Sequence, residues 1–337
     1  MHVQSNYRLD SNNTLALAST AQSLVCIDHL DLIPELQTLV NRYESYRILG
    51  GGSNVVLAPV LPGLLIKMQN RGIRLLKQTE SECIVEAEAG ENWHQFVQHC
   101  VRNNWLGLEN LALIPGTVGA APVQNIGAYG VELQQFVHQV QVWDFHQACW
   151  CYFTAQQCEF AYRDSLFKRA PTGRYLIAAV QFKLCTPKAW QPILRYPDLL
   201  NHPMLQKEVD ASAIFDAVIA VRQHKLPDPN QLANAGSFFK NPVVPKTLYE
   251  QIYARYPAVV AYEQADQMKL AAGWLIEQAG WKGKRLGPVG MHSRQALVLV
   301  NYGGASATDV HRLVQQVQSD VYAMFGVHLE QEPILMG

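Results

Sequence analysis

Two glycine-rich segments constrain this chain more than any other feature of its sequence. The first, Gly50-Gly51-Gly52-Ser53-Asn54, stands between the apolar runs 47–49 and 55–58. Successive glycines leave their backbone N–H groups uncovered and allow positive φ, so such loops can cradle a phosphate. A tight turn is the commoner explanation of a lone glycine run. The segment is not a P-loop, because no Gly-Lys-Ser/Thr follows, and the Gly-x-Gly-x-x-Gly pattern fails at Val55.

The second glycine-rich segment runs through residues 115–122 and continues to residue 130. It is rich in small residues, among them Gly116, Gly119 and Ala120, which allow a ligand to approach the backbone closely. Its pattern is typical of the start of a helix, and a helix N-terminus favours an anion. Two such segments in one chain favour a single extended diphosphate ligand over two separate packing turns.

Length and charge exclude several classes of protein. The 337 residues predict about two domains, and the 49% hydrophobic share excludes a disordered or fibrous chain. Lys and Arg total 27 against 28 Asp and Glu, so nucleic acid and anionic membranes are not expected partners. No stretch approaches the ~20 apolar residues of a membrane helix, and the N-terminus does not resemble a secretory signal. We therefore expect a cytoplasmic protein.

The cysteines predict free thiols. There are seven, at positions 26, 83, 100, 149, 151, 158 and 185, with no Cys-x-x-Cys pair. An odd count scattered through apolar runs is typical of reduced thiols packed as small hydrophobes, rather than of a disulfide framework or a zinc site. Cys149 and Cys151 are expected on one face of a strand.

The hydrophobic pattern predicts an α+β fold, because strands and helices follow one another without strict βαβ alternation. Strands are expected at 47–49, 55–58, 63–68, 73–77, 83–89, 138–144, 149–153, 175–185 and 295–301. Helices are expected at 34–43, 91–104, 213–225, 245–256, 268–279 and 309–325. The last helix is predicted to have Thr308 or Asp309 as its N-cap and Gly326 beyond its C-terminus. Residues 234–241 are predicted to form a polar turn around two phenylalanines.

A series of motifs makes the interpretation more specific. They are 50–54, 114–130, Tyr162-Arg163-Asp164-Ser165, Lys225-Leu226-Pro227-Asp228-Pro229, the stretches 236–242 and 269–277, and Leu329-Glu330-Gln331-Glu332. In this order the motifs resemble the UDP-N-acetylenolpyruvoylglucosamine reductase (UDP-N-acetylmuramate dehydrogenase, MurB) family. The resemblance covers nearly the whole chain and points to the longer family type, with an insertion that carries Tyr262.

The resemblance implies an FAD-binding fold of the vanillyl-alcohol-oxidase type, built from two α+β subdomains, with a further α+β substrate domain. The implied divisions are 1–62 with 331–337, then 63–222, then 223–330 for the UDP-sugar. FAD would be held non-covalently, since the first segment contains no histidine. The implied cofactor-binding residues are Gly50, Gly51, Gly52, Ser53, Asn54, Pro115, Gly116, Gly119, Ala120, Asn125, Ile126 and Gly127.

The implied reaction is reduction of an enolpyruvyl group, with NADPH as hydride donor and FAD as carrier. Without the resemblance, Ser237 would be interpreted as an ordinary turn serine and Arg163 as part of a surface ion pair. The resemblance implies instead that Ser237 donates a proton and that Arg163 polarises the substrate carboxylate. Alternation places His328, Glu330 and Glu332 on one strand face, either exposed or as a metal site. The resemblance needs no metal and implies that Glu332 is the third catalytic residue.

Substrate contacts follow from the same resemblance and from the need for cations near a diphosphate. NADPH and the UDP-sugar are expected to use the same region in turn. The implied substrate residues are Tyr129, Tyr196, Arg222, Lys225, Asn241, Tyr262 and Gln295, with Tyr262 expected in a polar loop that could close over the ligand. The alternatives are another FAD oxidoreductase of the same superfamily and a non-catalytic UDP-sugar-binding protein.

Overall fold

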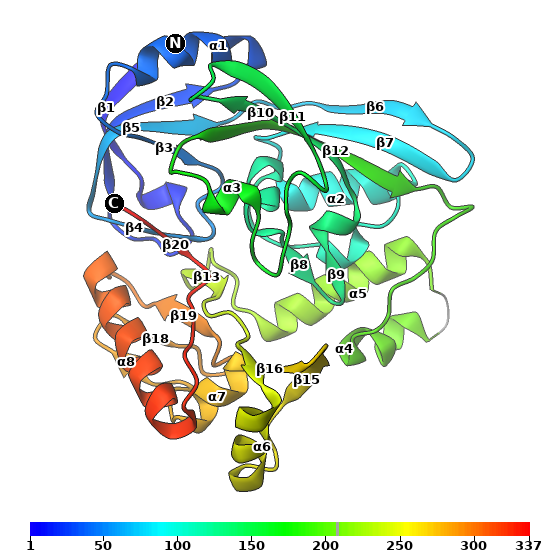
Figure 1. Cartoon of the computed structure of the whole chain (residues 1–337), viewed down its shortest axis with the longest axis vertical. Helices are drawn as coiled ribbons and strands as arrows, with labels where there is room; N and C mark the ends of the chain where they lie inside the picture. The colour runs from blue at the N-terminus through cyan, green and yellow to red at the C-terminus, as the bar shows by residue number, and fades with distance from the viewer. Residues whose placement is uncertain (207–208) are drawn as a thin grey trace. The chain divides into compact units, whose positions relative to one another are not determined.

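The computed structural model describes residues 1–206 and 209–337 (Figure 1). The chain folds as two compact units. Unit 1 comprises 1–7, 21–52 and 62–224, and unit 2 comprises 8–20, 53–61 and 225–337. Helices and strands are mixed in both units, which confirms the predicted α+β class. The division into three domains stays a prediction.

Unit 1 is built mainly on two sheets. One has the strand order β11 (Cys149–Thr154), β10 (Val137–Asp144), β12 (Tyr175–Cys185), β7 (Glu82–Glu88) and β6 (Ile73–Gln78), and all its pairs are antiparallel. The other has the order β1 (Val3–Arg8), β2 (Thr20–Ile27), β5 (Val60–Met68) and β3 (Tyr46–Leu49), with β3 and β5 parallel. The predicted strands of this part of the chain are confirmed. A hairpin of β8 (Gly127–Ala128) and β9 (Val131–Glu132) continues the second glycine-rich segment.

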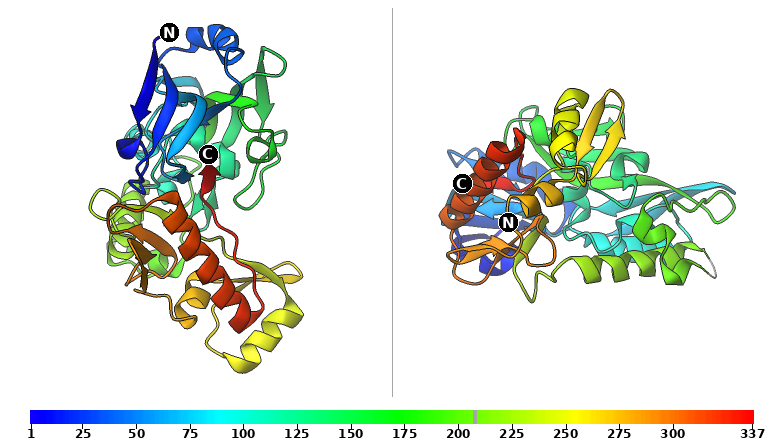
Figure 2. Two further views of the ribbon diagram at one scale, coloured as in Figure 1. Left: turned by 90° about the vertical axis from the view of Figure 1, so that its left-hand side faces the viewer. Right: turned by 90° about the horizontal axis from the view of Figure 1, so that it is seen from below.

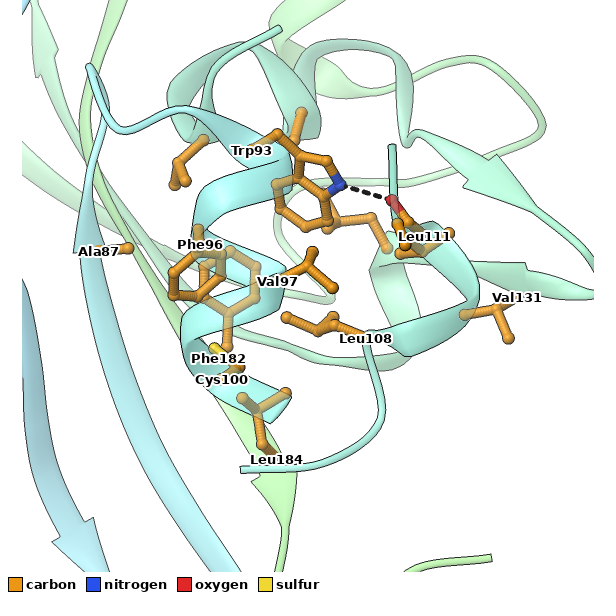
Figure 3. Packing of buried hydrophobic residues seen from close by; sticks show 14 of the residues in the cluster. Ala87, Trp93, Phe96, Val97, Cys100, Leu108, Leu111, Val131, Phe182 and Leu184 are labelled. Atoms are coloured by element: carbon orange, nitrogen blue, oxygen red, sulfur yellow. Dashed lines mark hydrogen bonds between the residues drawn. The ribbon is translucent and has the colours of Figure 1, made fainter. Parts of the chain in front are cut away.

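The main core of unit 1 lies between the large sheet and helix α2 (Trp93–Arg102), as Figure 3 shows. Asn92 caps this helix by accepting from the backbone N–H of Gln95. The apolar stripe that the spacing predicts is buried at Trp93, Phe96, Val97 and Cys100. The indole N–H of Trp93 donates to the carbonyl of Leu111 at 2.9 Å, so the buried polar atom is satisfied.

Four further α-helices complete the described part of unit 1. The α-helices are α1 (Ile33–Val40), α3 (Leu166–Arg169), α4 (Pro197–Leu200) and α5 (Ala211–Lys225), the last of which ends at the first residue of unit 2. The 3-10 helices within residues 1–206 and 209–337 are η1 (Asp10–Asn12), η2 (Leu30–Leu32), η3 (Glu109–Leu111), η4 (Val118–Gln124), η5 (Leu133–Gln135) and η6 (Pro203–Leu205).

Unit 2 has a four-stranded antiparallel sheet in the order β13 (Asn234–Ser237), β19 (Val298–Asn301), β18 (Val289–Met291) and β17 (Arg285–Leu286). A second sheet has the order β14 (Val243–Pro245), β16 (Gln267–Leu270) and β15 (Ala261–Gln264). The strand β20 (Ile334–Met336) pairs in parallel with β4 (Val55–Leu57). The helices are α6 (Lys246–Arg255), α7 (Ala272–Gln278) and α8 (Ala307–Phe325), and α8 packs on β18 and α7 (Figure 2).

Helix α8 starts earlier than the sequence predicts. Its N-cap is Ser306, which forms a capping box with Asp309, so the predicted N-cap at Thr308 or Asp309 is wrong. Asp309 serves the cap from the third helical position, where its carboxylate accepts from the Ser306 backbone N–H at 3.0 Å. The predicted C-terminus is confirmed, since Gly326 adopts the left-handed conformation at φ 67°.

Three further predictions in unit 2 need correction. Residues 234–237 form strand β13, not a turn, because they pair with the buried strand β19. The predicted helix 268–279 is shorter, since 267–270 pair with two neighbouring strands and only α7 is helical. Tyr262 lies on β15 opposite Lys269, not in a loop. In each case, pairing with another strand overrides the local pattern.

All seven cysteines are free of disulfide bonds. Cys149 and Cys151 lie on one face of β11 with their Sγ atoms 3.9 Å apart, as predicted. Within 1–206 and 209–337, no helix combines the length and apolar character that crossing a membrane requires. Within the same ranges, no three or more His, Cys, Asp or Glu side chains are grouped as metal ligands would be.

Candidate active site

The two glycine-rich segments touch in unit 1. A Cβ added to Gly51 would lie 2.9 Å from the Cα of Gly116, and one added to Gly50 would lie 3.0 Å from both Ala120 Cβ and Thr117 Oγ1. The backbone of the second segment therefore requires glycine in the first. The two segments pack directly on each other, as residues that hold one extended ligand need to do.

The second segment is fixed by the junction between β7 and α2. The N–H of Gly119 donates to the carbonyl of Ala89, and the N–H of Val118 donates to that of Glu91, both at 2.9 Å. A Cβ on Gly119 would lie only 2.5 Å from Ala89 Cβ, so this contact also requires glycine. The predicted helix start is the beginning of the 3-10 helix η4, with Thr117 at its N-cap.

These residues fit the diphosphate of a dinucleotide. Gly52 and Gly116 have φ of 67° and 126°, which turn successive backbone N–H groups in directions that other residues rarely allow. Ser53 and Asn54 come next in the sequence and carry a hydroxyl and an amide. Backbone N–H groups, a hydroxyl and an amide are the neutral donors that bind phosphate oxygens.

Asn125 supports the second segment from within. It is fully buried, and its Nδ2 donates to Glu132 Oε2 at 3.1 Å and to the Ala161 carbonyl at 3.0 Å. Its Oδ1 accepts from the backbone N–H of Gln134 at 2.9 Å. Because these hydrogen bonds are all to the protein itself, Asn125 fixes the path of the backbone that leads into Ile126 and Gly127. Both of these residues are partly exposed.

Arg163 stands on a strained turn beside the second segment. Its φ is 54°, an uncommon conformation for a residue with a long side chain. Its Nη2 donates to the carbonyl of Gly127 at 2.8 Å, and Lys168 Nζ donates to the carbonyl of Arg163 at 3.0 Å. Ser165 secures the same turn by donating to the carbonyl of Val123 at 2.6 Å. These bonds hold the guanidinium in one place, as recognition of a planar carboxylate requires.

Ser237 and Glu332 come together in unit 2. Ser237 ends β13, and the N–H of Glu332 donates to the carbonyl of the next residue, Phe238, at 2.9 Å. Glu332 is 9% exposed, whereas the side chain of Glu330 is 69% exposed and pairs with Lys240. The predicted common face for His328, Glu330 and Glu332 is therefore wrong. The chain there has only the isolated bridge Phe239–Gln331, so no regular strand imposes alternation.

The first glycine-rich segment is joined to Glu332. Asn54 Nδ2 donates to the carbonyl of Glu332 at 3.3 Å, and the N–H of Ile334 donates to the carbonyl of Asn54 at 3.0 Å. Pro333, which has no N–H, stands between these two bonds. The backbone of Glu332 is thus held on both sides.

Three of the predicted substrate residues belong to unit 1. The rings of Tyr129 and Tyr196 meet edge to face, with centroids 5.4 Å apart at 81°. The side chain of Arg222, on α5, is hydrogen-bonded to the Tyr129 side chain. Burial lowers the pKa of Arg222, and its Nε has no hydrogen-bond partner among the described residues.

The other four predicted substrate residues belong to unit 2. Asn241 Oδ1 accepts from the N–H of Ala272 at 2.9 Å, at the first turn of α7. Gln295 reaches the same turn, because its Oε1 would be 3.3 Å from a Cβ on Gly273. Lys225 is at the end of α5 and is partly exposed, and the exposed Tyr262 is on β15. Asn241 and Gln295 therefore share a location.

Sequence reasoning missed two residues that hold these groups. Thr117 Oγ1 would lie 3.0 Å from a Cβ added to Gly50. The side-chain amide of Asn110 donates to the backbone carbonyl of Tyr129. Asn110 stands in the apolar stretch 106–114, and a buried polar residue in such a stretch is a recognisable signal of a structural or functional hydrogen bond.

Two family models match parts of this chain. Residues 22–146 match the family described as FAD binding domain. Residues 228–336 match the family described as UDP-N-acetylenolpyruvoylglucosamine reductase, C-terminal domain. The FAD-binding match contains both glycine-rich segments, and the C-terminal match contains Ser237 and Glu332.

Curated relatives cover nearly the whole chain. The UDP-N-acetylenolpyruvoylglucosamine reductase of Bordetella pertussis is 51% identical over 96% of this chain and 92% of its own length. The protein of the same name from Dechloromonas aromatica is 50% identical over 100% of both chains. The crystal structure of UDP-N-acetylenolpyruvylglucosamine reductase from Thermus caldophilus has the same fold, with a TM-score of 0.71 at 24% identity over 100% of both chains. The chain therefore belongs to the UDP-N-acetylenolpyruvoylglucosamine reductase family, as its motifs predict.

Proposed function

We propose that this protein reduces the enolpyruvyl group of UDP-N-acetylglucosamine-enolpyruvate to give UDP-N-acetylmuramate, a step in peptidoglycan precursor synthesis. FAD would be the bound cofactor and NADPH the hydride donor. The observation that carries the proposal is the backbone bond from the buried Glu332 to Phe238, the residue after Ser237, in a chain whose residues 22–146 match an FAD-binding domain. The relatives named for this reaction support it at about half identity.

The chemistry that FAD supplies when bound is hydride transfer. The residues of this chain would hold it at two places: the segment 50–54 at the diphosphate, and the segment 115–127 alongside. The close contact of Gly51 with Gly116 supports this assignment, because it packs the two segments directly on each other.

The protein's own residues complete the reduction. Addition of a hydride to one carbon of the enolpyruvyl double bond leaves negative charge on the other carbon and its carboxylate, which must then gain a proton. In the proposed mechanism the Ser237 hydroxyl gives that proton, Arg163 binds the carboxylate, and Glu332 orients the reacting groups. A serine hydroxyl is a weak acid, so it needs a charged partner nearby.

The remaining predictions belong to the same proposal. Tyr129, Tyr196, Arg222, Lys225, Asn241, Tyr262 and Gln295 would bind the UDP-sugar, and NADPH would use the same region in turn. The domains would be 1–62 with 331–337, 63–222 and 223–330. Free thiols and a nucleotide-linked substrate support a cytoplasmic location.

The test is an anaerobic visible spectrum of the purified protein, followed through NADPH and then UDP-N-acetylglucosamine-enolpyruvate. We expect a yellow protein that bleaches with NADPH and regains its colour with the sugar. A protein that bleaches but ignores the sugar is another flavin oxidoreductase. A protein that cannot take up FAD contradicts the assignment of both glycine-rich segments.

A further inference from the structure

Tyr129 adopts a backbone conformation that its surroundings must enforce. Its φ is 49°, in the left-handed region that disfavours a residue with a large side chain. Such strained residues persist only where several contacts determine them together, and they are concentrated at ligand sites. The contacts of Tyr129 therefore show what maintains the strain.

Asn110 supplies the main backbone contact. It lies in η3 and is 1% exposed. Its Nδ2 donates to the carbonyl of Tyr129 at 3.1 Å and to the carbonyl of Ile193 at 2.9 Å. One amide thus ties the segment of Tyr129 to the segment that leads into Tyr196, and both hydrogens of the amide are used.

The side chains of the two tyrosines are held as well. The rings of Tyr129 and Tyr196 meet edge to face, and the Arg222 side chain is hydrogen-bonded to that of Tyr129. Glu109, next to Asn110, accepts from the indole N–H of Trp190 at 2.5 Å and fixes the start of the 190–196 stretch. Helix η3 therefore holds both the segment of Tyr129 and the 190–196 stretch in place.

We propose that Asn110 is a positioning residue for the UDP-sugar: it holds Tyr129 in its strained conformation and keeps Tyr196 against it, so that the two rings form a preorganised binding surface. This inference rests on the proposed function. A ligand that meets a preformed surface does not have to order it, and the free energy of ordering would otherwise be subtracted from binding.

The chain offers a matched control for Asn110. Asn70 is also fully buried, and its Nδ2 also donates to two acceptors, Glu88 Oε2 and the carbonyl of Ala178, each at 3.0 Å. In both residues Oδ1 has no partner within the described part of the chain. Asn110→Ala and Asn70→Ala therefore each remove two buried donations, one of them to a carboxylate in the case of Asn70, and only the first variant touches the tyrosines.

The first experiment compares the KM for the UDP-enolpyruvyl sugar in the two variants. Asn110→Ala should raise it about tenfold relative to wild type, the effect of one buried hydrogen bond. Its FAD content should be unchanged, and Asn70→Ala should keep the wild-type KM while losing similar thermal stability. If wild type does not turn over the sugar, the proposed function fails. If wild type does so and the KM of Asn110→Ala equals that of Asn70→Ala, the positioning role fails.

A double-mutant cycle supplies the second readout. If Asn110 acts through Tyr129, Asn110→Ala should add less than a twofold further rise in KM to Tyr129→Ala. Full additivity overturns the proposal. Should Asn110→Ala not fold, Asn110→Asp keeps the volume and loses both donations. Its KM should then fall as the pH is lowered, because a protonated carboxyl regains one donor, and a KM independent of pH in this variant would contradict the inference.

Discussion

The side-chain amide of Asn54 donates to the backbone carbonyl of Glu332, with 3.3 Å between nitrogen and oxygen. This bond joins the end of the first glycine-rich segment to a candidate catalytic carboxylate 278 residues further along the chain. A change in the backbone at either residue is therefore felt by the other.

Glu332→Gln should slow reoxidation of the reduced flavin by the sugar about 10²–10⁴-fold, because the proposed reaction needs a carboxylate at this position. The matched control is Glu330→Gln, two residues away, where the carboxylate is exposed and pairs with Lys240. Stopped-flow absorbance measures the rate of flavin reoxidation in both variants. Equal rates in the two variants would show that the buried carboxylate has no special role.

Ser237→Ala should leave reduction of the flavin by NADPH intact and slow its reoxidation by the sugar about 10²–10⁴-fold, the usual contribution of a positioned proton donor. Ser306→Ala is the control for stability. It removes the α8 N-cap at a cost of about 1 kcal/mol and should change neither half-reaction. Reoxidation at the wild-type rate in Ser237→Ala would refute the proton-donor assignment.

Arg163→Lys should also slow reoxidation, by at least about tenfold, because an ammonium cannot bind a carboxylate through two parallel hydrogen bonds. Arg169 is a suitable control, since its exposed guanidinium pairs with Asp164 and Glu159 on the same turn. Arg169→Lys should retain the wild-type rate, as surface ion pairs contribute little. A full rate in Arg163→Lys would exclude carboxylate binding through the guanidinium fork.

Gly51→Ala should weaken FAD binding about tenfold or more, because the new methyl would lie 2.9 Å from the Cα of Gly116 and force the two segments apart. Gly280→Ala is the control. Gly280 has φ 78° with open space around its Cβ position, so alanine there costs about 1 kcal/mol of stability without touching the segments. Titration of the FAD-free protein with FAD gives both affinities, and equal values would argue against a cofactor at this contact.

Asp144 should make the stability of unit 1 depend on pH. Burial by itself would raise its pKa, but hydrogen bonds from Arg174 and from the N–H groups of His146 and Gln147 outweigh burial and lower the pKa. A lowered carboxyl pKa contributes stability that is present above its ordinary value and lost as the pH falls through the folded value.

Asp144→Asn should therefore lower the urea midpoint at pH 7, and the difference from wild type should shrink between about pH 5 and pH 2. Asp216, exposed on α5, gives the control Asp216→Asn, whose midpoint should follow wild type throughout. A difference for Asp144→Asn that is constant with pH would show that the carboxylate's charge is not what stabilises the fold.

The sequence predicts best those helices and strands whose characteristic pattern lies entirely within their own residues. Helix α2 and strand β7 each show their own apolar face, and Gly326 follows α8 where a left-handed residue is needed. The two glycine-rich segments are recognisable for the same reason, since each is a continuous run of residues in the sequence.

The errors arise where distant partners decide the structure. Ser237 is on a strand because β19 pairs with it, and β16 is extended because it lies between β14 and β15. The burial of Glu332 depends on its bond to Phe238, which a strand period cannot reveal. The sequence around Asn110 signals a buried hydrogen bond but not its acceptors, because these two carbonyls lie 19 and 83 residues further along the chain.

The parallel pairing of β4 with β20 has a consequence for biosynthesis. Residues 53–61 leave the ribosome early, but the strand that completes them is translated hundreds of residues later. At roughly 5–20 residues per second, the interval is tens of seconds. During that time β4 lacks its neighbouring strand, so the flavin binding proposed for the adjoining segment 50–54 would follow translation of the chain's last strand.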